Sequence, residues 1–319
     1  MVDLGPSFTR EISVARFEVP EGASYLRGHA VPEERSVGGP VWRARQEARR
    51  VTFEVVTQED AEWIEVEHSA GDFERIYLHD QGAISGWLAS LAEPIFVDMT
   101  SLALRTWAPI LRAALSVGAK FRFVYVEPSD YVRQLGGRDF SLSDYTEGIS
   151  SIPGFASVAS ITDEPVPLIA MLGFEGARLT RIIQRLEPPP GQTFPVIGVP
   201  GYKVEFPFYS YEGNQRELEQ NFLYSQVVHA RANCPFEAFV ALSNIRAALG
   251  GVRLQVAPIG TKPHAVAAAL FALACDGDVE LIYDHPKRAA RPTQGASRVC
   301  VYYMSEFIQS RAYTAVSAA

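Results

Sequence analysis

Cysteine is scarce in this sequence, which has three in 319 residues: Cys234, Cys275 and Cys300. An odd number without metal-like spacing argues against a complete disulfide framework and against a zinc site of the usual kind. All three lie in apolar segments. We therefore interpret them as small buried hydrophobic residues of a protein in a reducing compartment, the cytoplasm.

Long apolar runs and an excess of basic residues are missing as well. No window of about 18 residues is apolar and free of charge, which predicts no membrane-spanning helix. The N-terminus carries an acidic residue before any apolar run, so we expect no signal peptide. The formal net charge of −8 argues against general nucleic-acid binding but is compatible with a small anionic ligand.

The familiar nucleotide and hydrolase motifs are absent too. There is no G-x-x-x-x-G-K-[ST] loop, no G-x-G-x-x-G after an apolar run, and no G-x-S-x-G elbow. No set of histidine, cysteine and carboxylate residues has zinc spacing. The sequence therefore predicts no metal ion and no cofactor, and it shows no catalytic constellation.

Two hydrophobic patterns divide the chain. Between Arg50 and Asp80 apolar and polar residues alternate with period two, as in small antiparallel sheets. From Glu93 onward short apolar runs alternate with amphipathic helices, the pattern of a parallel sheet with crossover helices. We predict an N-terminal β-rich region, residues 1–90, and a Rossmann-like α/β domain, residues 91–319, with helices on both faces of a mostly parallel sheet.

Ligands of doubly wound sheets bind outside the carboxyl ends of the strands, so the turns that follow the apolar runs are the candidate sites. These turns are rich in polar and turn-forming residues. They are residues 98–101, 127–131, 173–176, 200–202, 260–264 and 284–288.

The segment Val252–Ala274 is the most informative of these. It predicts a buried strand, a sharp turn at Gly260, and a helix with Thr261 as its N-cap. A helix N-terminus has unpaired N–H groups and a partial positive charge, and Lys262 and His264 add side-chain donors there. We predict that this turn binds a phosphate or a nucleotide. The alternative for Lys262 is a solvated surface charge.

The first turn of the predicted Rossmann-like domain, with Asp98, Thr100 and Ser101, offers hydroxyl and carboxylate groups suited to phosphate or ribose. We expect these residues to share the ligand with Gly260, Thr261, Lys262 and His264, at one edge of one sheet. Simple capping of the next helix is the alternative for Thr100 and Ser101.

Candidate acid–base groups are Glu175, Asp284 and His285, which also follow apolar runs. Each has a structural alternative. Glu175 complements the dipole of the helix that follows it, or pairs with Arg178 three residues on. His285 is a turn residue between an aspartate and a proline.

The strand–GTK–helix unit APIGTKPHAVAAALFAL resembles the glycine-threonine-lysine turn of CARF domains, the Rossmann-like sensors of cyclic oligonucleotides in prokaryotic antiviral systems. This resemblance implies that Thr100 and Ser101 in a first turn, and Gly260, Thr261 and Lys262 in a later one, grip the backbone of the ligand. Ile259 stands where the family usually has the first glycine of the later turn.

Three functions remain open at this stage. The first is a bacterial protein that binds a nucleotide or a nucleotide-derived signal, as a homodimer or as a subunit of an antiphage defence system. The second is a hydrolase acting on nucleotides or nucleosides at the same edge of the sheet. The third is a non-catalytic structural subunit of a complex, whose turns only cap helices.

Overall fold

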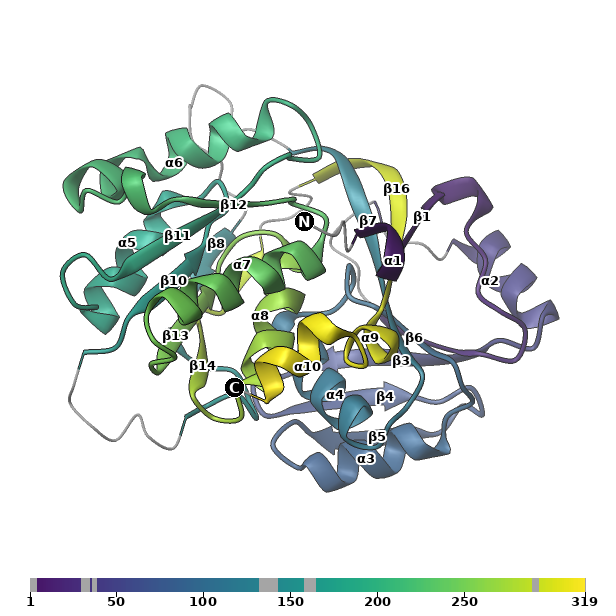
Figure 1. The fold of residues 1–319 in the computed structure, drawn as a ribbon. Helices are drawn as coiled ribbons and strands as arrows, with labels where there is room; N and C mark the ends of the chain where they lie inside the picture. The colour runs from purple at the N-terminus through teal and green to yellow at the C-terminus, as the bar shows by residue number, and fades with distance from the viewer. Residues whose placement is uncertain are drawn as a thin grey trace. The chain divides into compact units, whose positions relative to one another are not determined.

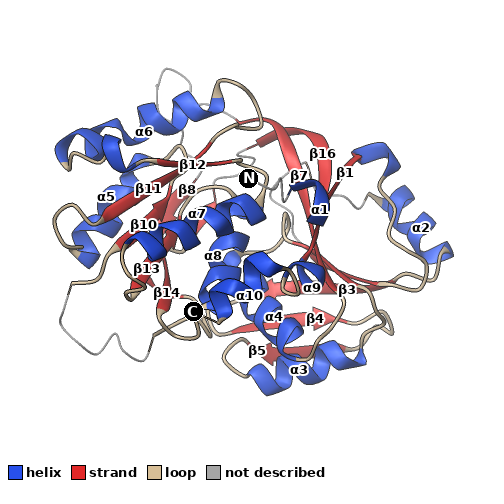
Figure 2. Cartoon of the chain, in the orientation of Figure 1, coloured by secondary structure: helices blue, strands red, loops and turns tan. Residues whose placement is uncertain are grey.

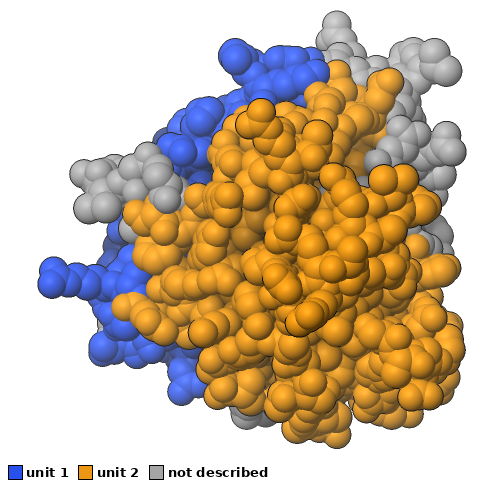
Figure 3. All heavy atoms as spheres, turned by 90° about the vertical axis from the view of Figure 1, so that its right-hand side faces the viewer, with its two compact units in different colours: residues 1–5, 132–292, 310–319 blue, residues 6–131, 293–309 orange. Residues whose placement is uncertain are grey.

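The parallel strands predicted from the apolar runs form two sheets rather than one. This is seen in a computed structural model, which describes residues 5–29, 35, 39–131, 143–157, 165–288 and 293–318. The contacts divide the chain into two compact units, coloured separately in Figure 3. Unit 1 comprises Met1–Gly5, Val132–Pro292 and Ser310–Ala319, and unit 2 comprises Pro6–Tyr131 and Thr293–Gln309.

Unit 2 contains an eight-stranded sheet in the order β1-β16-β7-β6-β2-β3-β4-β5. The four central strands, β7, β6, β2 and β3, are parallel, and the flanking strands are antiparallel. The strands are β1 (Thr9–Ser13), β2 (Ser24–Gly28), β3 (Thr52–Glu59), β4 (Trp63–Glu67), β5 (Phe73–Tyr77), β6 (Ile95–Asp98), β7 (Phe121–Tyr131) and β16 (Thr293–Tyr303).

Aromatic side chains form much of the core on one face of this sheet. Trp42 packs against Phe17, Tyr25 and Phe53 with ring centroids 5.3–6.1 Å apart. Trp42 lies on α2, and α3 contacts α4 elsewhere in the same unit. The helices are α1 (Gly5–Phe8), α2 (Pro40–Ala48), α3 (Gln81–Ser90), α4 (Leu104–Ser116) and α9 (Met304–Phe307).

Unit 1 contains a six-stranded sheet in the order β12-β11-β10-β13-β14-β9, parallel except for β9. A separate antiparallel pair joins β8 to β15. The strands are β8 (Ser143–Thr146), β9 (Ser150–Ser151), β10 (Leu168–Met171), β11 (Thr193–Gly198), β12 (Val228–Ala230), β13 (Leu254–Pro258), β14 (Val279–Tyr283) and β15 (Pro286–Arg288).

Helices cover both faces of this second sheet (Figures 1 and 2). Leu168, Ala170 and Leu172 point into one core with residues of α5 and α6, while the intervening Ile169 and Met171 are also fully buried. A strand whose alternate residues are all buried is enclosed on both sides. The helices are α5 (Gly176–Leu186), α6 (Phe206–Gln220), α7 (Pro235–Ala248), α8 (Lys262–Ala274) and α10 (Arg311–Ser317).

The predicted fold class, a Rossmann-like α/β arrangement with mostly parallel strands, is confirmed. The predicted boundary at residue 90 differs from the observed division, because β6 and β7 pair into the same sheet as β2 and β3. Residues 127–131, predicted as a turn, extend β7, since β16 returns from the end of the chain to pair with them.

The three cysteines are free and buried, as predicted. Burial raises the pKa of Cys234 and Cys275 to about 11, so both thiols are protonated at neutral pH. Within the described ranges, no helix has both the length and the apolar character needed to cross a bilayer.

Candidate functional site

The order of strands in unit 1 reverses between β10 and β13. The chain first moves outward from β10 through β11 to β12, then returns to place β13 on the other side of β10 and β14 beyond it. At such a reversal the connections that follow the two adjacent strands lead to opposite faces of the sheet, and ligands of doubly wound sheets bind there. The turns concerned contain residues 173–176 and 260–264, two of the candidates from the sequence.

These two turns contact each other through glycine. A Cβ atom added at Gly173 would lie 3.0 Å from the carbonyl oxygen of Ile259 and 3.3 Å from the Cα atom of Gly260. A Cβ atom at Gly260 would lie 2.6 Å from the carbonyl oxygen of Leu172. The backbones of the two turns therefore approach too closely for a side chain at Gly260, and a side chain at Gly173 would fit only if the turn at Ile259 shifted slightly.

The helix that begins in this region is capped as predicted. The Thr261 hydroxyl accepts a hydrogen bond from the backbone N–H of His264 at 3.4 Å and donates one to the carbonyl oxygen of Ala232 at 2.8 Å. Lys262 is the first residue of α8 and is partly exposed. The hydroxyl thus has structural partners, while the first turn of the helix carries a partial positive charge and Lys262 adds a full one.

His264 is fully buried, so the structure does not present it at the surface as a ligand donor. Its Nε2 atom donates to the carbonyl oxygen of Arg231 at 3.1 Å, which ties α8 to the turn after β12. Burial lowers the pKa of His264 to about 4, although the carbonyl groups of Arg231 and Ala230 oppose this shift. The imidazole is therefore neutral at neutral pH, and its role in this structure is to hold the turn.

Asp284 is fully buried and is held by Arg178 of α5. The Nε and Nη2 atoms of Arg178 donate to the two carboxylate oxygens at 2.9 and 2.5 Å, and Nη1 donates to the carbonyl oxygen of Ile259 at 2.9 Å. Burial lowers the pKa of Arg178, but its hydrogen bond to Asp284 and the nearby negative charge outweigh this effect and raise the pKa overall. Asp284 thus fastens α5 to the edge of the sheet, an arrangement that suits structure better than proton transfer.

The other two acid–base candidates lie nearby. Glu175 occupies the N-cap position of α5 and makes no side-chain capping bond there. His285 has a left-handed backbone, with φ of 43°, and its Nε2 atom lies 2.9 Å from the hydroxyl oxygen of Ser150 on β9. The structure therefore pairs His285 with a serine that the sequence did not indicate.

The predicted residues of the first turn lie in unit 2, where the strand order also reverses, between β2 and β6. The Asp98 Oδ1 atom accepts from the backbone N–H of Thr100 at 2.9 Å, and the Thr100 hydroxyl accepts from that of Val126 at 2.9 Å. The Ser101 hydroxyl accepts from the backbone N–H of Gly28 at 2.9 Å and donates to the carbonyl oxygen of Asp98 at 2.9 Å.

Two conclusions follow for this turn. The side chains of Thr100 and Ser101 organise the backbone around them, and neither caps α4, whose N-cap residue is Ala103. They also belong to a different sheet from Gly260, Thr261 and Lys262, so the single sheet edge that we expected to unite both sets is not observed.

A group of aromatic side chains was missed in the sequence. Phe174, Tyr202, Phe206 and Tyr209, here called the aromatic cluster, come from the turns after β10 and β11 and from the start of α6. The signal was present in the run GYKVEFPFYSY, in which aromatic residues recur far more often than in the rest of the chain.

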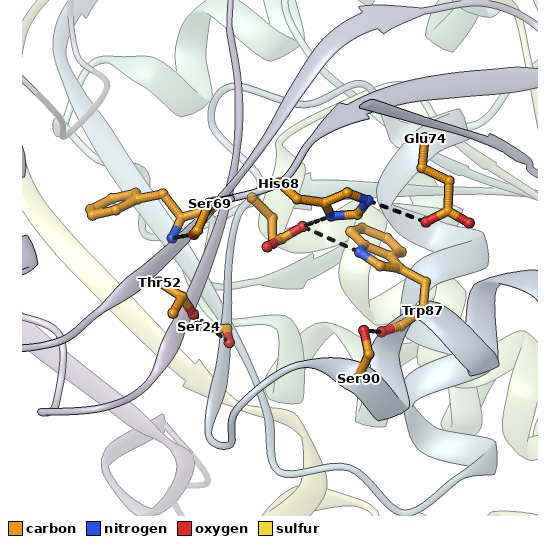
Figure 4. A network of polar contacts seen from close by, with 9 residues as sticks. Ser24, Thr52, His68, Ser69, Glu74, Trp87 and Ser90 are labelled. Atoms are coloured by element: carbon orange, nitrogen blue, oxygen red, sulfur yellow. Dashed lines mark hydrogen bonds and ion pairs between the residues drawn. The ribbon is translucent and has the colours of Figure 1, made fainter. Parts of the chain in front are cut away.

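A second unpredicted group lies in unit 2 and is drawn in Figure 4. His68 lies between two carboxylates: its Nδ1 atom is 2.6 Å from Glu54 and its Nε2 atom is 3.2 Å from Glu74. The indole N–H of Trp87, on α3, donates to the same oxygen of Glu54 at 3.4 Å. Because β3, β5 and α3 contribute to the group, it links three elements of this unit.

No family model and no curated protein matches the chain. Among solved structures, a periplasmic ribose ABC transporter from Conexibacter woesei aligns with 82% of this chain and 70% of its own, at 15% identity and a TM-score of 0.21. A functionally unknown protein from Pseudomonas aeruginosa aligns with 82% of both chains, at 10% identity and a TM-score of 0.26. At these values neither similarity bears on the function of this chain.

Proposed function

We propose that unit 1 binds a small anionic ligand of the nucleotide class where its strand order reverses, between β10 and β13. The observation that carries the proposal is the contact between the turns at Gly173 and Gly260, which sets the start of α8 at this edge of the sheet. The backbone N–H groups of the first turn of α8 and the ammonium group of Lys262 are the groups suited to a phosphate.

The ligand contacts in this proposal come from unit 1 alone. Thr100 and Ser101 are left out because their hydroxyl groups serve the backbone of unit 2. Binding of a cyclic oligonucleotide, as the resemblance to CARF domains implies, would make the protein a sensor of a nucleotide signal, with a place in an antiphage system. Binding of mononucleotides alone would place it outside that role.

Thermal unfolding in the presence of mononucleotides, dinucleotides and cyclic oligonucleotides tests the proposal. A ligand at about 100 times its dissociation constant stabilises the folded protein by about 2.7 kcal/mol and raises the unfolding midpoint. We expect Lys262→Ala to abolish this rise while leaving the midpoint of the unliganded protein nearly unchanged. Lys120→Ala removes the same charge from an exposed site in unit 2 and should keep the rise. An undiminished rise in Lys262→Ala would reject the site.

One observation favours a second function, hydrolysis of a nucleotide or nucleoside. The Ser150 hydroxyl and the His285 imidazole lie 2.9 Å apart, within the distance at which a histidine accepts the proton of an attacking serine. Chromatography of nucleotide mixtures after incubation tests this function. Ser150→Ala and His285→Ala should each remove a product that the wild-type protein forms, whereas Glu175→Gln tests the carboxylate alternative. If no product forms, hydrolysis is excluded for the compounds in the mixture.

A further inference from the structure

The aromatic cluster lies at the same edge of the unit 1 sheet as the start of α8. Phe174 contacts Phe206 and Tyr209 edge to face, with ring centroids 5.6 and 5.9 Å apart. Tyr202 contacts Phe206 at 6.5 Å. Phe206 is buried at 3% exposure, whereas Phe174, Tyr202 and Tyr209 are partly exposed. The cluster therefore combines one buried aromatic residue with three that are partly exposed.

Two connections place these rings beside the start of α8. The Tyr202 hydroxyl and the Thr261 hydroxyl both donate to the carbonyl oxygen of Ala232, at 3.3 and 2.8 Å. Phe174 directly follows Gly173, whose backbone is in contact with that of Gly260. The turns that carry the rings and the turn that starts α8 are therefore direct neighbours.

Contacts other than those between the rings also hold α6 to the turn after β10. Asn214 of α6 already donates to the carbonyl oxygen of Gly173 at 2.8 Å. A Cβ atom at Gly213 would lie 2.0 Å from the carbonyl oxygen of Phe174, so helix and turn are in backbone contact there.

The charged groups around the cluster favour a particular kind of ligand. The Lys203 ammonium lies 5.7 Å from the centroid of the Phe206 ring, and Lys262 begins α8. Glu175, in the same turn as Phe174, disfavours a bare polyanion but accepts hydrogen bonds from hydroxyl groups. A ligand that combines a phosphate, a sugar with hydroxyl groups and a flat ring matches the lysine ammonium groups, the Glu175 carboxylate and the aromatic rings, respectively.

We infer that the aromatic cluster receives the base of a nucleoside phosphate whose phosphate lies at the start of α8. This inference rests on the proposed function and adds to it the residues that hold the base of the nucleotide. Stacking of a base on aromatic side chains is tolerant of base identity and strengthens binding by about tenfold or more.

The inference is tested by isothermal titration calorimetry of the full chain. The ligands are AMP, GMP, CMP and UMP, and their affinities are compared with those of ribose 5-phosphate and inorganic phosphate. We expect at least one nucleotide to bind about tenfold or more tightly than ribose 5-phosphate, which lacks only the base. Equal binding of all nucleotides and ribose 5-phosphate overturns the inference and leaves the proposed anion site standing. If none of these compounds binds, the inference fails, and the proposed function fails as well only if the dinucleotides and cyclic oligonucleotides also leave the unfolding midpoint unchanged.

Substitutions in the cluster locate the effect. Tyr209→Leu should weaken nucleotide binding about tenfold and leave ribose 5-phosphate unaffected, while Tyr209→Phe, which keeps the ring, should bind like the wild type. Phe208→Leu is the matched control, because this neighbouring side chain is 68% exposed and lies outside the cluster. If Tyr209→Leu does not fold, Phe174→Leu replaces it with the same expected loss. Unchanged nucleotide affinity in a folded cluster variant overturns the inference.

Discussion

The imidazole of His68 is held between Glu54 and Glu74, and this geometry makes part of the stability of unit 2 depend on pH. Burial lowers the pKa of His68, but the hydrogen bond to Glu54 and the charges of both carboxylates outweigh it and raise the pKa above its usual value. A raised pKa means that folding favours the charged ring. The stabilisation is complete below the pKa of the unfolded chain, about 6.5, and is lost as pH rises through the higher pKa of the folded protein.

Replacement of His68 by glutamine tests this dependence. We expect His68→Gln to lower the free energy of unfolding by about 2 kcal/mol at about pH 6 and by less at about pH 8. Urea unfolding of both proteins at the two pH values measures the difference. His79→Gln, at an exposed histidine in the same unit, serves as the control and should show little change at either pH. If the loss in the free energy of unfolding were larger at the higher pH, folding would not favour the charged form of His68.

A second prediction concerns the buried ion pair of Arg178 and Asp284. Arg178→Met leaves the carboxylate of Asp284, which is fully buried, without its main partner, and should cost about 3–5 kcal/mol of stability. Arg181 is the natural comparison, because its guanidinium lies 3.7 Å from the same carboxylate but is 42% exposed. Arg181→Met should cost less than about 1 kcal/mol in the same urea titrations. Equal losses would show that the buried geometry is unimportant.

Among the elements, the packing of α5 on α6 depends on two glycines. A Cβ atom at Gly176 would lie 1.8 Å from the carbonyl oxygen of Gly213, a distance that the two helices can relieve only by moving apart. We expect Gly176→Ala to destabilise the protein by about 3 kcal/mol. Gly86→Ala in α3 is the matched control, since a Cβ atom there meets nothing within 4 Å. Gly86→Ala should leave the stability of the protein unchanged or raise it by about 0.5–1 kcal/mol, as measured by thermal and urea unfolding.

Local signals in the sequence were sufficient for many elements. The helix α8 and its N-cap Thr261 were predicted, because the cap, the following proline and the apolar run all act within a few residues. The strand β2 was missed, although it lies at the centre of the unit 2 sheet, because it has only five residues between turn-forming segments. Its position depends on pairing with β3 and β6, which the local pattern does not encode.

The candidate site divides in the same way. The turn at Gly260 was predicted from its own residues. The pairing of Arg178 with Asp284 and that of Ser150 with His285 were not, since each joins residues more than 100 positions apart in the chain. Likewise, Thr100 and Lys262 follow strands of different sheets, and a linear series of apolar runs cannot distinguish two sheets from one.

For the whole molecule, the decisive strand is β16. It lies between β1 and β7 in the unit 2 sheet and contributes the buried residues Val299, Cys300, Val301 and Tyr302. A chain ending at residue 292 should therefore lose amide protection in β1 and β7, as measured by hydrogen exchange with mass spectrometry. A chain ending at residue 309 lacks only the C-terminal segment with α10 and should keep that protection. Equal protection in both truncated chains would contradict this dependence.

The position of β16 in the sheet also determines when the unit 2 sheet can be completed during synthesis on the ribosome. The first strands of unit 2 are made early, yet the strand that joins β1 to β7 emerges only after nearly all of unit 1 has been translated. During that interval the backbone groups along one side of β7 have no neighbouring strand, a condition that favours aggregation. The nascent chain therefore passes through a stage in which the edge of β7 is unpaired because β16 has not yet been synthesised. Chaperones that shield such edges would act at that stage.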